Sequence, residues 1–290
     1  MIPAMNITAW SKVAPWAEQR QVEQDLIISR AIIELFGDEF LAEELRFRGG
    51  TALNKLHFPE PLRYSEDIDL VRTTKGPIKA VLRRVREILE PWLGEAAFEQ
   101  SPVSPKLIFR ADAEDGGAPL RLKVEIAIWE IESYAGPAQL DYAVDNPWFA
   151  GKAPIPTFTH EEMLATKLRA LLQRDKGRDL LDLSHGLEVF DGLDAPQVVA
   201  LFLRYLEADK LSLSRAQAEE RMFAKLANPG FLPDIRPLLT PSAADELTDE
   251  AVKQAFAAVF SSFIAHLPGK PWARTDEMNE RFGLAPGGKA

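Results

Sequence analysis

The stretch LRFRGGTALNKLHFPEPLRYSEDIDL, residues 45–70, decides the fold that we expect for this chain. Its first four residues have a strand-like pattern that breaks at Gly49-Gly50 into a predicted helix. Residues 65–71, SEDIDLV, alternate polar and apolar side chains with the period of two that is typical of a strand. A strand, a glycine-initiated helix and a second strand therefore form the predicted centre of the fold.

Amphipathic and alternating patterns on both sides of this centre extend it into a sheet with helices. Residues 17–36 and 78–93 place apolar side chains at helical spacing. Residues 106–111 and 120–130 have strand patterns and are joined by the turn-rich segment EDGGAP. These elements predict an α/β (α+β) domain with a small mixed sheet flanked by helices.

The second half of the chain has a different pattern. The Pro- and Gly-rich segment NPWFAGKAPIPTF, residues 146–158, marks a predicted domain boundary. Beyond it the strong patterns are helical, over residues 160–174, 177–190, 195–208 and 249–267. We therefore expect an α/β domain over residues 1–152 and an all-α domain over residues 153–290.

Two aspartates, Asp67 and Asp69, carry the sharpest chemical signal. In a strand they point to the same face, while Ile68 and Leu70 point to the other. Two carboxylates about 4 Å apart repel by about 4 kcal/mol at an effective dielectric near 20. A divalent cation such as Mg²⁺, which prefers oxygen ligands and phosphate, relieves that repulsion. The plainer alternative is a solvated strand face.

Glu125 extends this signal to a later strand. In LRLKVEIAIW the apolar residues form one face, while Arg121, Lys123 and Glu125 share the other. If the two strands are neighbours, Glu125 joins Asp67 and Asp69 in a platform for two metal ions. The alternative is that Glu125 pairs with Lys123 or Arg121 on an exposed sheet.

The segment Gly49-Gly50-Thr51 predicts a phosphate contact. Two glycines at a helix start let backbone N–H groups approach a phosphate closely, and Thr51 can cap the helix. Ser65 and Lys55 are further candidate phosphate contacts. Ser65 is equally compatible with a turn, and Lys55 with a solvated helix position.

A basic segment opens the helical half. Residues 163–178 contain five basic residues and one acidic residue, a local charge of 5 − 1 = +4. On one continuous helix, Lys167, Arg174, Arg178 and Asp182 would share a face. That face is a candidate cradle for a triphosphate and an RNA backbone. The alternative is that Arg178 and Asp182 form an ordinary surface pair.

Taken in order, these motifs resemble the nucleotidyltransferase toxins of the AbiEii/AbiGii type, which include the MenT toxins and belong to the DNA polymerase β-like superfamily. The resemblance spans residues 45–185. It rests on Gly49-Gly50-Thr51, on Asp67 and Asp69, on Glu125 in KVEI, and on Lys167 followed by the segment RDLLDL at 178–183.

The resemblance implies a specific chemistry and site. Mg²⁺, or Mn²⁺, would be held by Asp67, Asp69 and Glu125. A nucleoside triphosphate would be bound by Gly49, Gly50, Thr51, Ser65, Lys55, Arg178 and Asp179, with Asp179 orienting Arg178 or Lys167. Lys167 would neutralise charge on the phosphates, and Glu125 or Asp182 would accept the hydroxyl proton.

The resemblance also implies an RNA acceptor, with the tRNA 3′ end as the specific expectation, a cognate antitoxin, and growth arrest as the outcome. Two other classes stay open. The acceptor could be a protein hydroxyl, or the protein could be a non-catalytic module that binds nucleotide.

The composition bears on the protein's location in the cell and on how it could bind RNA. The chain has 290 residues, no cysteine and a net charge of 34 − 44 = −10. We expect no disulfide, no membrane span and no export signal, and therefore a cytoplasmic protein. Because the net charge is negative, we expect any RNA to bind only at a local basic groove. Trp129 falls on the polar face of its strand, where it either lines a base pocket or packs against a helix.

Overall fold

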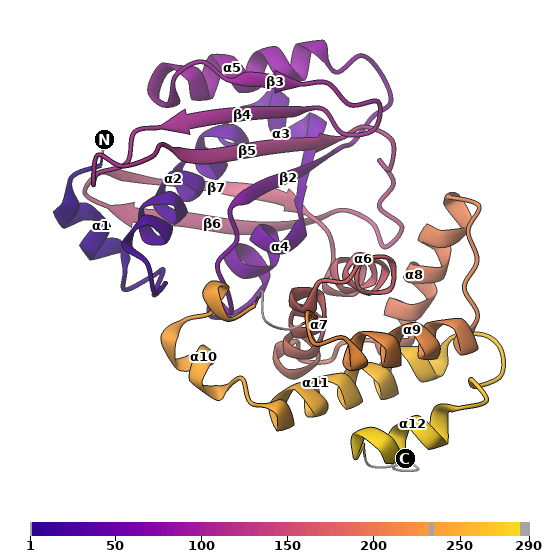
Figure 1. Cartoon of the computed structure of the whole chain (residues 1–290). Coiled ribbons are helices and arrows are strands. Elements are labelled where there is room, and N and C mark those ends of the chain that lie inside the picture. The colour runs from indigo at the N-terminus through magenta and orange to yellow at the C-terminus, as the bar shows by residue number, and fades with distance from the viewer. Residues whose placement is uncertain (1, 232–234, 285–290) are drawn as a thin grey trace. The chain divides into compact units, whose positions relative to one another are not determined.

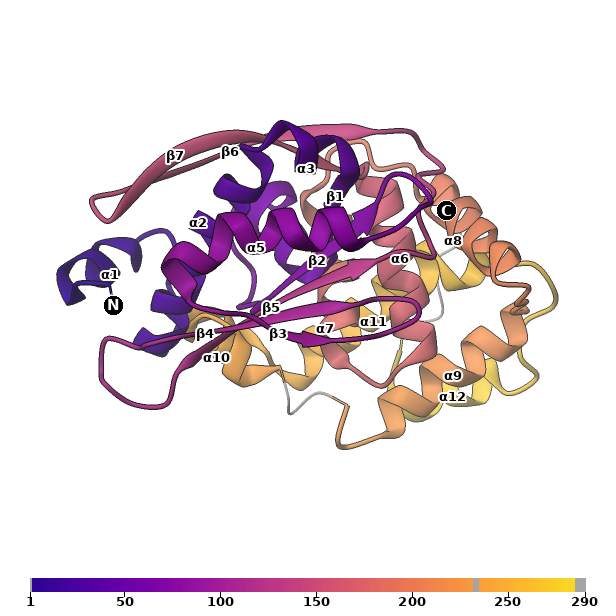
Figure 2. The ribbon, with the colours of Figure 1, turned by 90° about the horizontal axis from the view of Figure 1, so that it is seen from above.

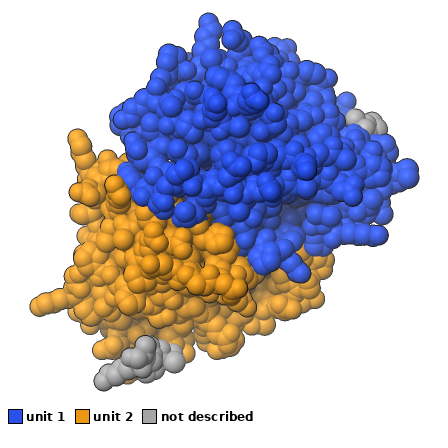
Figure 3. Space-filling view, turned by 180° about the vertical axis from the view of Figure 1, so that it is seen from behind, with its two compact units in different colours: residues 1–159 blue, residues 160–290 orange. Residues whose placement is uncertain are grey.

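The computed structural model describes residues 2–231 and 235–284, which divide into two compact units, Met1–Thr159 and His160–Ala290 (Figures 1 and 3). The division follows Thr159 and not residue 152, because the segment around the expected boundary is a strand of the first unit. In the described part of the chain, no helix is long and apolar enough to cross a membrane.

The first unit is built on a five-stranded mixed sheet in the order β1-β2-β5-β4-β3. The pairing of β2 with β5 is parallel and the other pairings are antiparallel. The fold class and the adjacency of the two acidic strands are confirmed. The strands are β1 (Leu45–Arg48), β2 (Asp67–Arg72), β3 (Ala97–Glu99), β4 (Lys106–Ala111) and β5 (Leu120–Ala127).

One face of this sheet carries the core, since buried apolar residues alternate along its strands. Phe47, Leu70, Val124 and Phe109 are almost completely buried. Each such side chain contributes about 1.5–3 kcal/mol relative to its exposed state. Helices α2 (Gln19–Phe36) and α5 (Lys79–Leu93) pack against the sheet, and the shorter helices α1 (Ala4–Trp10) and α3 (Glu39–Glu44) precede β1.

A second, two-stranded sheet corrects the expectation of a linker. Strands β6 (Ala138–Asn146) and β7 (Phe149–Thr157) form an antiparallel hairpin. Helix α2 contacts both this hairpin and β5, so it lies between the two sheets (Figure 2). Pro154 and Pro156 alternate with the buried Ala153 and Ile155. A strand with only one partner tolerates prolines, which cannot donate hydrogen bonds.

The glycine-initiated helix follows β1 as expected. It begins as α4 (Gly49–Ala52) and continues as a π-helical turn, Leu53–His57. Asn54 anchors the loop that leads to β2, because its side chain donates to the Gly50 carbonyl and accepts from the backbone N–H groups of Leu62 and Arg63. The helix start and the loop are therefore held together.

The second unit is helical throughout its described residues, as expected. Its elements are α6 (His160–Gln173), α7 (Gly177–Val189), α8 (Ala195–Ala208), α9 (Arg215–Ala227), α10 (Pro241–Glu246), α11 (Asp249–Ser262) and α12 (Thr275–Phe282), with 3₁₀ turns at Arg236–Leu238 and Ile264–His266. Phe223 packs with the rings of Phe256, Phe260, Trp272 and Phe282 in its core.

Helices α6 and α7 are separate, as the two helical patterns predict, so the condition of one continuous helix through Lys167 and Asp182 is not met. Helix α6 ends at Gln173 and α7 begins at Gly177, with Lys176 in an extended conformation between them. The two helices pack against each other. Lys167 and Asp182 therefore meet across a helix pair and not along one helix face.

A buried polar centre ties the N-terminal segment to the glycine-initiated helix. Asp25 accepts hydrogen bonds from the indole N–H groups of Trp10 and Trp16, at 2.8 and 3.1 Å, and from Lys55 Nζ at 2.8 Å. Its exposed fraction is 4%. One carboxylate therefore joins α1, α2 and the π-helical turn.

We predict that Asp25→Ala destabilises the first unit by about 3–5 kcal/mol, because it leaves the buried Lys55 ammonium without its counter-ion. Five of the six tryptophans lie in this unit, so their fluorescence during urea unfolding measures the change. Arg83→Ala, in an exposed pair with Glu87, is the control and should change nothing measurable. If both variants unfolded at the same urea concentration, Asp25 would not be a stabilising centre of the first unit.

Candidate active site

Three carboxylates lie together on one face of the first unit's sheet. In the register of the parallel pair, Asp69 stands opposite Glu125, and Asp67 opposite Lys123. On the other side of β2, Arg48 of β1 stands opposite Asp69. The predicted constellation of Asp67, Asp69 and Glu125 is therefore assembled by strand pairing alone.

Lys123 provides the positive charge nearest to this constellation. Its Nζ lies 2.9 Å from Asp67 Oδ2 and 3.1 Å from Glu125 Oε2. Partial burial lowers the pKa of Lys123, but the hydrogen bonds and charges of Asp67 and Glu125 outweigh that effect and raise it above its usual value. The pairing of Glu125 with Lys123 that we named as an alternative is thus present in the structure.

Asp69 is the carboxylate least compensated by its surroundings. Burial raises the pKa of Asp69 above its usual range, and the charge of Asp67 raises it further, while Arg48 and Lys123 act in the opposite direction. Oδ1 of Asp67 is buried without a hydrogen-bond partner. An uncompensated carboxylate beside an unpartnered carboxylate oxygen is a donor set that fits a divalent cation.

The protein side chains alone do not complete a metal centre. Within residues 2–231 and 235–284, no group of three or more His, Asp or Glu side chains is arranged to hold a metal ion. Mg²⁺ usually takes one or two carboxylates and completes its shell with water and substrate phosphates. Asp67 and Asp69 fit that pattern.

Gly49 and Gly50 are required by close contacts. Gly49 has φ +85°, and a Cβ there would lie 2.3 Å from Asp69 Oδ2. A Cβ on Gly50 would lie 2.4 Å from the Arg63 guanidinium and 3.2 Å from Ser65 Oγ. The helix start therefore touches Asp69 on one side and the loop before β2 on the other.

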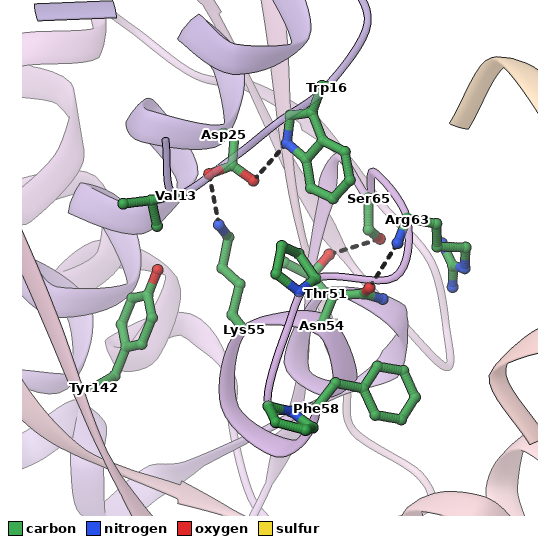
Figure 4. A pocket seen from close by; sticks show the side chains of 12 residues that line it. Val13, Trp16, Asp25, Thr51, Asn54, Lys55, Phe58, Arg63, Ser65 and Tyr142 are labelled. Atoms are coloured by element: carbon green, nitrogen blue, oxygen red, sulfur yellow. Dashed lines mark hydrogen bonds and ion pairs between the residues drawn. The ribbon is translucent and has the colours of Figure 1, made fainter. Parts of the chain in front are cut away.

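Thr51 and Ser65 face each other where this loop enters β2. The Thr51 hydroxyl lies 2.8 Å from Ser65 Oγ and also donates to the Asp67 carbonyl. Both residues line a cavity of about 160 Å³, together with Trp16, Tyr142 and Lys55 (Figure 4). The structure thus places the predicted phosphate contacts Thr51, Ser65 and Lys55 around one cavity, with Gly50 next to Ser65 and Gly49 next to Asp69.

Lys55 is not the solvated helix residue that we named as the alternative. It is buried, and its Nζ donates to Asp25 at 2.8 Å and to Ser29 Oγ at 2.9 Å. Burial lowers the pKa of Lys55, but the charges of Asp25 and Tyr142 raise it on balance. The ammonium is committed to Asp25, so the alternative of a solvated lysine does not hold.

The second unit has its own buried ion cluster. Lys167 Nζ lies 2.7 Å from Asp182 Oδ2 and 3.4 Å from Asp179 Oδ1, and both aspartates are completely buried. Arg174 forms two hydrogen bonds with Asp179, at 2.7 and 2.9 Å. Asp179 therefore orients Lys167, as expected, and Arg174 instead of Arg178. The alternative of an ordinary surface pair between Arg178 and Asp182 does not hold, because Asp182 is completely buried and pairs with Lys167.

Of the basic residues found here, Arg48 was not named from the sequence, Lys123 was named only as a possible partner of Glu125, and Arg174 only as part of the candidate cradle. Arg48 could have been found from the alternation in LRFR, which opposes it to Phe47. Lys123 shares a strand face with Glu125, and Arg174 belongs to the basic segment, but neither pattern shows which carboxylate each side chain reaches.

The sheet order, the glycine-initiated helix and the paired aspartates define a nucleotidyltransferase fold. The structure resembles MenT4, a nucleotidyltransferase toxin from Mycobacterium tuberculosis, with a TM-score of 0.66 at 20% identity over 98% of this chain and 99% of that one. JHP933 from Helicobacter pylori matches with a TM-score of 0.50 at 16% identity, over 92% and 95% of the two chains. At these identities the likeness concerns the fold.

The sequence itself establishes the family. Residues 31–276 match the family described as nucleotidyl transferase AbiEii toxin of a type IV toxin–antitoxin system. The chain belongs to the AbiEii nucleotidyltransferase toxin family, which confirms the resemblance drawn from the motifs. No curated protein sequence matches it.

We predict that Gly49→Ala perturbs the site through the clash with Asp69. Gly94→Ala is the matched control, because Gly94 has nearly the same φ, +82°, with nothing within 4 Å of an added Cβ. In both variants the free energy of unfolding should fall by about 1 kcal/mol, because alanine is strained at this positive φ. Gly49→Ala alone should be destabilised further by the clash with Asp69. It alone should also bind Mn²⁺ more weakly, as measured by titration calorimetry. Equal effects in both variants would show that the contact with Asp69 is unimportant.

Proposed function

We propose that this protein is a toxin that transfers a nucleoside monophosphate from a nucleoside triphosphate to an RNA acceptor, with the tRNA 3′ end as the specific target. The observation that carries the proposal is the contact of the Gly49 helix start with Asp69, beside the unpartnered Oδ1 of Asp67. Family membership supports the toxin class.

Asp67 and Asp69 are the residues that would hold Mg²⁺ or Mn²⁺. A bound divalent cation supplies positive charge that polarises the phosphate oxygens and offsets the charge that develops during transfer. Both aspartates are partly buried, and the Asp67 side chain is 31% exposed, so a cation can reach it. Their repulsion in the absence of a cation is what makes the pair selective for cationic ligands.

The triphosphate is assigned to the helix start. The backbone N–H groups of Gly49–Thr51 and the hydroxyl of Ser65 would donate hydrogen bonds to the phosphate oxygens, and the absence of side chains on the two glycines would allow close approach. Through the family motif, Lys167 is assigned to neutralising phosphate charge, Arg178 to binding phosphate, and Asp179 and Asp182 to holding Lys167 in one orientation.

The reaction breaks the bond between the α- and β-phosphates. The acceptor hydroxyl attacks the α-phosphate, pyrophosphate leaves, and the hydroxyl proton passes to one of two carboxylates, Glu125 or Asp182. The product is an acceptor extended by one nucleotide, and a tRNA extended in this way is unable to accept its amino acid. Growth arrest, a cognate antitoxin and a cytoplasmic location follow from this proposal.

Trp129 supports a nucleic-acid acceptor over a protein acceptor. Its exposed fraction is 72%, so it does not pack against a helix. The next residue, Glu130, forms an ion pair at 3.5 Å with Arg48, which flanks Asp69. The exposed indole, two residues beyond the end of β5, offers a stacking surface for a nucleobase.

We predict that Asp67→Asn abolishes incorporation of labelled nucleotide, because it removes half of the paired charge that binds the cation. The assay incubates the protein with Mg²⁺ and each of the four triphosphates, with either purified tRNA or bulk protein as acceptor. Asp145→Asn, on the exposed face of β6, is the control and should keep full activity.

Three outcomes would contradict the proposal. Full activity of Asp67→Asn would remove the aspartates from the mechanism. Label in protein only would replace the RNA acceptor with a protein hydroxyl. Triphosphate binding with no release of pyrophosphate by the wild-type protein would indicate a non-catalytic nucleotide-binding module.

We predict that Trp129→Ala raises KM for the RNA acceptor about tenfold, because stacking on an aromatic ring contributes about 1–3 kcal/mol per base. Its KM for the triphosphate should stay unchanged. Trp129→Phe should recover most of the affinity, and Phe40→Ala, another exposed aromatic, should have no effect. An unchanged KM for RNA in Trp129→Ala would remove this residue from acceptor binding.

A further inference from the structure

Lys123 lies where the three-carboxylate arrangement would place a second cation. Its ammonium bridges Asp67 Oδ2 at 2.9 Å and Glu125 Oε2 at 3.1 Å, and its side chain is only 17% exposed. The register of β2 and β5 sets this position, because Lys123 is opposite Asp67 and shares a strand face with Glu125.

We propose that Lys123 takes the place of a second divalent cation, so that the site binds one metal ion through Asp67 and Asp69, with Glu125 as the anchor of Lys123 and not a metal ligand. This inference rests on the proposed function, since it concerns the same site. A site with one metal ion and Lys123 would thus take the place of the site with two metal ions that the three carboxylates predict from the sequence.

Glu125 is already satisfied by groups of the protein. Besides Lys123, its carboxylate lies 3.8 Å from Lys106 Nζ. By contrast, Asp67 keeps one buried oxygen, Oδ1, without a partner. The oxygen available to a metal ion therefore belongs to Asp67, which stands next to Asp69.

The net charge of this face favours the binding of one divalent cation and not two. The charges of Asp67, Asp69 and Glu125 are only partly offset by Lys123, Lys106 and Arg48, because Arg48 also pairs with Glu130. A second divalent ion near Glu125 would meet the ammonium of Lys123 at close range, where like charges repel by many times the thermal energy at an effective dielectric of about 20. Within the described residues, no three acidic or His side chains converge on a metal position.

The test counts metal ions on the intact protein without nucleotide or RNA. Mn²⁺ titration followed by electron paramagnetic resonance should give one bound ion per wild-type chain. Lys123→Met removes the bridging charge and should bind a second ion, or bind the first at least tenfold more tightly. Lys123→Arg retains the charge and should behave like the wild-type protein. Two ions on the wild-type protein, or no change in Lys123→Met, would overturn the inference.

A second variant covers the case in which Lys123→Met does not fold. Glu125→Gln should change Mn²⁺ affinity less than threefold, because Glu125 is not a ligand here, whereas Asp69→Asn should lose binding. A tenfold or greater loss in Glu125→Gln would make Glu125 a ligand and contradict the inference. Because these measurements use no triphosphate, their failure is distinguishable from failure of the proposed transfer reaction, which the incorporation assay tests separately.

Discussion

The parallel pairing of β2 with β5 is the constraint on which the site depends. It places Asp67, Asp69 and Glu125 on one face, and such a cluster of like charges is unfavourable unless cations compensate it. The first unit supplies some of that compensation through Lys123, Lys106 and Arg48. Asp69 stays under-compensated, with a raised pKa. In the proposed function, a divalent cation would supply the positive charge that the protein side chains do not.

The surrounding fold holds this unfavourable arrangement in place. The opposite face of the sheet is buried apolar surface, so a one-residue shift in register would bury the carboxylates and expose the core. Gly49 lets the helix start lie directly on Asp69, and Asn54 fixes the loop that delivers Ser65. The Asp25 centre connects the same helix to α1 and α2. Rigid support of this kind is what allows like charges to remain side by side.

Much of this was predictable from sequence because it depends on short-range periodicity. The alternation of SEDIDLV and LRLKVEIAIW predicted both acidic strands, and the parallel pairing then brought Asp69 and Glu125 together. The β6–β7 hairpin was missed because prolines and glycines in a strand with one partner look like a linker. The pairing of Lys167 with Asp182 across α6 and α7 and the burial of Lys55 by Asp25 depend on tertiary packing, which no local pattern contains. The same limit applies to Lys123, whose strand face was predictable but whose bridging position was not.

The central claim is that one cation on Asp67 and Asp69 holds a triphosphate against the Gly49 helix start. A crystal structure with Mn²⁺ and a non-hydrolysable nucleoside triphosphate, with anomalous diffraction data at the manganese edge, tests it most directly. We expect one protein-bound manganese peak at the two aspartates, phosphate oxygens at the backbone N–H groups of Gly49–Thr51, and Glu125 still paired with Lys123. A triphosphate bound elsewhere, or a manganese ion ligated by Glu125, would contradict it.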